Sequence, residues 1–157
     1  MEATDAIIRA AFPEHPVPTT FFGVERPQQD DIWLELASRI QGRVWTSLSL
    51  LDWRMTGVSP GTVQGYLVPK ALAYYVPSFL IGAILEPDFR DLAFGAILPN
   101  NQWRRPRGEW WMSFAAAFTD PQRVAIRTFL AYERKADGFT FDLVDEELVS
   151  AAENLWT

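Results

Sequence analysis

The stretch 70–86, KALAYYVPSFLIGAILE, has no charged residue between Lys70 and Glu86. An element that is apolar nearly all round is typical of a helix buried among other helices. Pro77 removes one backbone hydrogen bond in the middle of the stretch, so we expect it to kink this helix. The apolar run 71–85 is shorter than the roughly 20 residues that cross a bilayer, which favours a buried core helix over a membrane span.

Amphipathic helices are expected on both sides of this central helix. Apolar residues recur at helical spacing after Asp30, after Thr119 and after Asp145, as they do in helices with one buried face. Thr119 and Gln122 also have the spacing of a capping box. We expect two further short helices, one capped by Thr4 and one over 89–98.

Two segments have a less regular pattern. The run WTSLSLLDW, 45–53, fits a strand or a helix by periodicity alone, and we favour a helix. The run PNNQWRRPRGEWW, 99–111, is rich in Pro, Asn and Gly, which predicts a loop.

Length and composition indicate one folded domain over 1–157. The chain has 157 residues, of which 48% are hydrophobic and 14% aromatic, so it can bury a substantial core. It has no cysteine and no readable signal peptide at its beginning, so we expect a cytoplasmic protein. The expected fold is all-α, an irregular helical bundle around the kinked helix at 70–86.

The net charge of −6 is concentrated at one end of the chain. Residues 136–157 contain six acids and no Lys or Arg, whereas the other 135 residues sum to zero. A general nucleic-acid binder needs a basic face that releases counterions, so we expect no nucleic-acid partner.

Residues for common catalytic chemistry are scarce. His15 is the single histidine and lies between prolines, and no serine has the spacing of a nucleophile elbow. Hydrolysis by serine or cysteine needs a nucleophile with a nearby base. The sequence therefore predicts no catalytic residue, metal site or cofactor, although it does not settle whether the protein is an enzyme.

The middle of the chain resembles a known family in two motifs. Residues 75–80, Tyr-Val-Pro-Ser-Phe-Leu, and the later Thr119 to Gln122 spacing are similar to an uncharacterised family of small bacterial proteins. That family has a Tyr-Leu-Pro-x-Phe-Leu core motif followed by a Thr-x-x-Gln helix, and Val76 here replaces the leucine. The resemblance implies a bacterial origin and a helical fold, without a known activity.

The acidic end of the chain is the first candidate site. We expect a non-enzymatic protein-binding module, such as a bacterial immunity protein that neutralises a toxin. Its acidic surface would bind a basic partner through Asp142, Asp145, Glu146 and Glu147. The alternative is that acids in a first helical turn complement the helix dipole.

Two other interpretations remain open. An aromatic and arginine cleft could serve a ligand-binding protein or an enzyme, formed by Trp103, Arg104, Arg105, Arg107 and Trp110. Bases or sugars stack on such side chains. The chain could also be a structural subunit that forms a homodimer.

Overall fold

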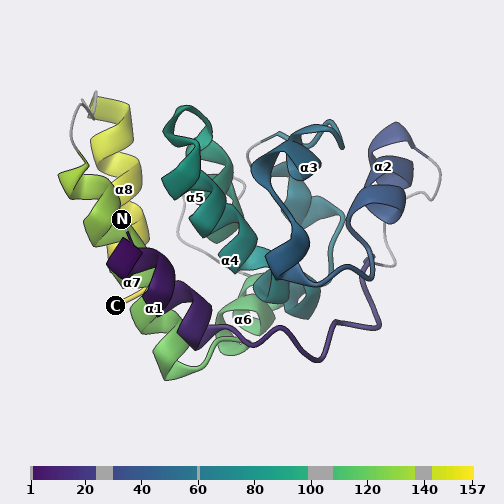
Figure 1. Ribbon diagram of the computed structural model, residues 1–157, viewed down its shortest axis with the longest axis horizontal. Helices are drawn as coiled ribbons and strands as arrows, with labels where there is room; N and C mark the ends of the chain where they lie inside the picture. Colours follow the sequence, from purple (N-terminus) through teal and green to yellow (C-terminus); the bar gives the residue numbers. More distant parts are fainter. Residues whose placement is uncertain (1, 24–29, 60, 99–107, 137–142) are drawn as a thin grey trace.

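Helix α4 lies in the middle of a set of helices in the computed structural model (Figure 1). The structure describes residues 2–23, 30–59, 61–98, 108–136 and 143–157, except the side chains of 143–146 and 148. The α-helices are α1 (Glu2–Ala11), α2 (Asp31–Arg39), α3 (Leu50–Arg54), α4 (Pro69–Leu85), α5 (Asp91–Ile97), α6 (Glu109–Ala116), α7 (Asp120–Lys135) and α8 (Leu143–Leu155). The described residues also form the short 3-10 helices η1 (Trp45–Ser47), η2 (Thr62–Gly65) and η3 (Pro87–Phe89).

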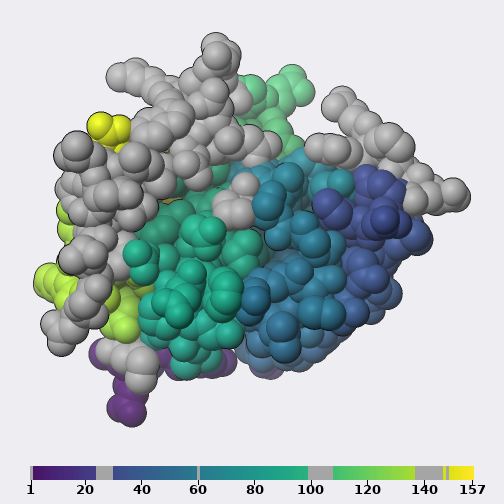
Figure 2. Space-filling model, turned by 90° about the horizontal axis from the view of Figure 1, so that it is seen from above, coloured from purple at the N-terminus to yellow at the C-terminus, as the bar shows by residue number. Residues whose placement is uncertain are grey.

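The fold is all-α, as the sequence predicts. Within the described ranges no strand forms, and Phe22 and Leu67 make one isolated antiparallel bridge. Helix α4 contacts α1, α3, α5 and α6, while α1 also packs on α7, and α7 on α8. Seen from above, α5 lies between the C-terminal helices on one side and α2 with α3 on the other (Figure 2).

The central helix matches its predicted range to within one residue at each end. Pro69 occupies its first turn, where a missing N–H costs nothing. The helix continues through Pro77, next to which Ser78 makes two buried hydrogen bonds. Its Oγ donates to the Tyr75 carbonyl at 2.6 Å and accepts from Trp53 Nε1 at 3.0 Å.

Aromatic side chains fill two parts of the core. Against α4, the ring of Trp53 lies 4.3 Å from that of Phe79. Farther along the chain, Trp156 packs edge-on against Phe114 and Phe118. Because Trp156 is fully buried, the last turns of the chain belong to the core.

Four predicted elements differ from the observed ones. Helix α1 begins at Glu2, so Thr4 is a buried residue within the helix rather than its cap, and acids at Glu2 and Asp5 favour the earlier start. The segment 45–53 divides into η1 and α3, where Ser49 and Asp52 form a capping box. The helix expected over 89–98 is the shorter α5, preceded by η3.

Helix α6 is the fourth difference, because it begins inside the predicted loop 99–111. Gly108 precedes it with φ of 94°, and Glu109 occupies its first turn. Trp111 and Phe114 then face the core at helical spacing. The predicted loop is too long because its Pro, Asn and Gly residues end at Gly108, and the residues after Gly108 have the apolar spacing of a helix.

Candidate functional site

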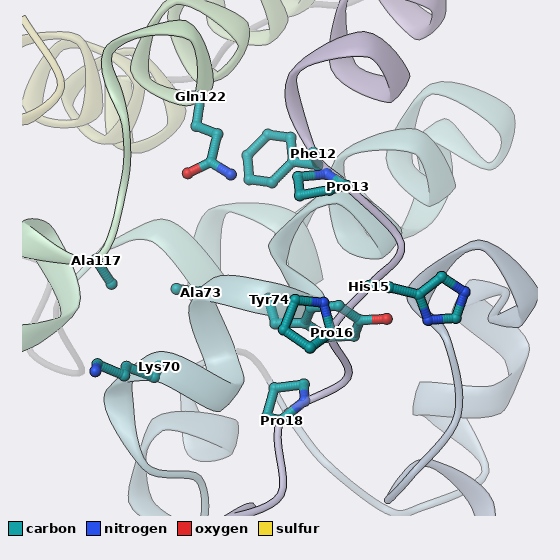
Figure 3. A pocket seen from close by; sticks show the side chains of 10 residues that line it. All are labelled: Phe12, Pro13, His15, Pro16, Pro18, Lys70, Ala73, Tyr74, Ala117 and Gln122. Atoms are coloured by element: carbon teal, nitrogen blue, oxygen red, sulfur yellow. The ribbon is translucent and has the colours of Figure 1, made fainter.

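A cleft opens where the segment after α1 passes the first half of α4 (Figure 3). Its volume is about 320 Å³. Its three walls are the segment after α1, the first half of α4 and the junction between α6 and α7. The cleft is lined by Phe12, Pro13, His15, Pro16, Pro18, Lys70, Ala73, Tyr74, Ala117 and Gln122.

The proline-containing wall is held in place by hydrogen bonds to η1 and α4. Trp45 Nε1 donates to the Pro13 carbonyl at 3.2 Å, and the Tyr74 hydroxyl donates to the Glu14 carbonyl at 2.6 Å. Thr46 Oγ1 donates to the Glu14 carboxylate at 2.6 Å. These contacts fix a segment that has no regular secondary structure of its own.

Tyr74 is a fixed part of the cleft wall. Its hydroxyl also accepts the Trp45 backbone N–H at 3.2 Å, so it is bonded as donor and as acceptor. Burial raises the pKa of Tyr74 above 10.0, with the Glu14 charge adding to the increase and the Trp45 N–H opposing it. The phenol is therefore neutral at physiological pH and suited to positioning rather than to proton transfer.

Gln122 is oriented by the capping box predicted from the sequence. Its Oε1 accepts the Thr119 N–H at 2.9 Å, and the Thr119 hydroxyl accepts the Gln122 N–H at 3.5 Å. Because the carbonyl oxygen is used in this way, the amide nitrogen is the end turned toward Phe12 in Figure 3. The cleft thus has one oriented donor from α7.

Lys70 and His15 lie at opposite ends of the cleft. Figure 3 shows the Lys70 side chain below Ala117, and the His15 ring on the far side of Pro16, directed away from the other lining residues. In the described part of the chain, no ion pair joins Lys70 to a carboxylate. The cleft is an apolar surface with one cation at its edge.

The predicted acidic site is described only in part. Asp142 lies outside the described residues, as do the side chains of Asp145 and Glu146, while Glu147 is exposed on α8. Farther along α8, Glu153 binds Arg134 of α7 through two oxygens, at 2.5 and 3.0 Å. One of the six acids of residues 136–157 is therefore paired with an arginine of α7.

The other two arginines of α7 contact backbone carbonyls. Arg127 donates to the Trp156 carbonyl at 2.9 Å. Arg123 donates to the Ala115 carbonyl, and its guanidinium lies 5.6 Å from the centre of the Trp156 ring. Both side chains therefore help to hold the end of α8 and the α6–α7 junction.

The predicted aromatic and arginine cleft also falls mostly outside the described residues, which omit Trp103, Arg104, Arg105 and Arg107. Trp110 is described. Its Nε1 donates to the Leu67 carbonyl at 3.1 Å, and its ring stacks on Phe114 at 5.1 Å. In this position Trp110 joins α6 to the residues before α4.

Sequence analysis gave no indication of the cleft beside α4 as a site. Its lining combines residues from 12–18, 70–74 and 117–122, and spacing along one segment does not reveal such a surface. Two sequence features could have indicated the cleft. They are the concentration of prolines after α1 and the presence of Tyr74 in an otherwise apolar helix.

Among the residues with described positions, no group of three His, Asp or Glu side chains lies together as a metal site would require. No described helix combines the length and hydrophobicity of a bilayer crossing. Comparison of the chain with protein-family models, curated proteins and solved structures found no match.

Proposed function

We propose that the protein is a non-enzymatic binding module whose acidic C-terminal end docks a basic protein, as an immunity protein docks a toxin. The observation that carries the proposal is the placement of charge. Residues 136–157 hold six acids and no cation, which accounts for the whole net charge of −6.

The contacts between α7 and α8 pair one acid of α8 and leave another exposed. Toward the end of α8, Arg134 pairs with Glu153 and Arg127 caps the Trp156 carbonyl. Earlier on α8, Glu147 is exposed and has no ion-pair partner among the described residues. Arg127 and Arg134 thus contact residues at the end of α8, and Glu147 is exposed and accessible to a partner.

A concentrated acidic surface has a defined kinetic effect. Complementary fields steer a basic partner during diffusion and raise the association rate more than the final affinity. Added salt screens this steering over a Debye length of about 8 Å at physiological ionic strength. An association rate that depends strongly on salt is therefore the signature expected of this surface.

The test reverses the four acids proposed for docking. The variant carries Asp142→Lys, Asp145→Lys, Glu146→Lys and Glu147→Lys. Its binding to the most basic protein encoded by the flanking genes is measured by biolayer interferometry at low and physiological salt. We expect the association rate to fall by about tenfold or more, and the salt dependence to disappear.

A matched control reverses exposed acids in the first turns of other helices, namely Glu2, Asp31, Asp91 and Asp120. It changes the net charge by the same amount at exposed positions elsewhere on the surface. Equal losses in both variants would indicate a general charge effect. Unchanged binding after reversal of the four C-terminal acids would refute the proposed surface.

A further inference from the structure

The cleft beside α4 has the size and the surface of a site for a small molecule. Its volume of about 320 Å³ lies at the lower end of the range for ligand sites in proteins. The walls offer the rings of Phe12 and Tyr74 and the flat faces of Pro13, Pro16 and Pro18. Such walls favour a flat apolar body of about two fused rings.

Hydrogen bonds within the protein hold the walls of the cleft in place. Hydrogen bonds from Trp45 and Tyr74 hold Pro13 and Glu14, and the capping box orients Gln122. The free-energy cost of immobilising these groups when a ligand binds is therefore small.

The charged groups around the cleft favour a ligand with a negative charge. Lys70 is exposed at the edge, and no carboxylate is among the lining residues. His15 lines the opposite end with its ring turned away (Figure 3). Glu14 lies beside Tyr74, away from Lys70, and its carboxylate accepts a hydrogen bond from Thr46. One cation among the lining residues matches a ligand with a single negative charge better than a doubly charged phosphate ester.

We propose that this cleft binds a small aromatic monocarboxylic acid, with its rings against Phe12, Tyr74 and the prolines and its carboxylate toward Lys70. The Gln122 amide nitrogen, which is turned toward Phe12, is a donor for a polar group on the ring system (Figure 3). The proposal does not depend on the acidic C-terminal surface, so either one can fail without the other.

The test uses 2-naphthoate as the probe, titrated into the full chain and followed by two-dimensional amide NMR. We expect a dissociation constant on the order of 1 mM for a ligand of this size, with shifts concentrated at Ala73, Tyr74, Ala117 and Gln122. The neutral amide of the same shape, 2-naphthamide, should bind about fivefold more weakly because it lacks the charge.

Two variants separate the charge from the shape of the site. Lys70→Met removes the cation and should weaken 2-naphthoate about fivefold while leaving 2-naphthamide unchanged, whereas Lys135→Met, at an exposed cation on α7, should change neither. Ala117→Leu fills the cleft and should weaken both probes. Thermal unfolding of each variant verifies that it is folded.

Several results would overturn the proposal. Equal affinity for the acid and the amide, or wild-type affinity for 2-naphthoate in Lys70→Met, would show that the charge of Lys70 does not contribute to binding. Wild-type affinity in folded Ala117→Leu, or chemical-shift changes centred on other residues, would show that the probe does not bind in this cleft. Tighter binding of a tripeptide ending in phenylalanine with a free carboxylate would assign the site to polypeptide ends instead of small acids.

Discussion

Helices α4 and α7 are nearly equal in length, at 17 and 16 residues, but their surroundings differ. Almost every residue of α4 after Lys70 is buried, whereas α7 buries one face and exposes a row of charged side chains. Contacts on all sides therefore hold α4, while α7 depends on its apolar face, its capping box and its neighbours α1 and α8. Changes on the buried side of α7 should cost far more than changes on its exposed side.

The largest effect is expected at Trp156, the residue after α8, which packs against α6. Trp156→Ala removes the ring packed on Phe114 and Phe118 and the hydrogen bond from Nε1 to the Ile97 carbonyl at 2.9 Å. The free energy of unfolding should fall by about 3–5 kcal/mol, as for other large aromatic residues truncated in a core. Urea denaturation measures this loss.

Trp53→Ala, on the side of α4, is the matched comparison. Trp53 is also fully buried and donates to Ser78, so a loss of the same size would show that both regions depend equally on one aromatic side chain. If Trp156→Ala lost less than about 1 kcal/mol, α8 would not be part of the cooperative core.

Glu133 is the exception on the buried side of α7, and it should make stability depend on pH. It is 3% exposed, and burial raises its pKa from 4.5 to about 7, against the lowering effect of Arg90. The native state therefore binds the proton more strongly than the unfolded chain. Its stabilising effect is complete below about pH 4.5 and is lost as pH rises through about 7.

The Glu133→Gln variant removes this titration. It should equal the wild type near pH 4 and exceed its free energy of unfolding by about 2–3 kcal/mol at pH 8. Urea midpoints across this pH range measure the difference. The exposed Glu147→Gln serves as control, and parallel pH profiles for Glu133→Gln and the wild type would contradict the expectation.

The same contrast explains which features could be predicted from sequence. The central helix and the capping box at Thr119 and Gln122 depend on residues close in the chain, and both are confirmed. The burial of Glu133 was not predicted, because its surroundings include Arg90 of another segment. A local pattern reports which face of a helix is apolar, but not which distant group packs beside a given polar side chain.

The site was less predictable than the fold for a related reason. The cleft depends on where 12–18 passes α4, which is set by hydrogen bonds between residues such as Trp45 and Pro13, 32 positions apart. The acidic site came from a compositional pattern and remains a prediction, since the described side chains include Glu147 but not Asp142, Asp145 or Glu146. Charge along a sequence indicates a possible partner, whereas a cleft requires the tertiary structure.

The smallest effect is expected on the exposed side of α7. Arg134 and Glu153 have side chains that are 32% and 36% exposed, so water and salt screen their ion pair, and its contribution should be below about 1 kcal/mol. Arg134 also donates to Ser150 at 3.1 Å, so Arg134→Met alone would mix several losses. A double-mutant cycle of Arg134→Met and Glu153→Gln, measured by urea denaturation at low and high salt, isolates the pair. A coupling energy above about 2 kcal/mol, unaffected by salt, would mean that this surface helps to hold α7 as its buried face does, and the contrast with α4 would no longer stand.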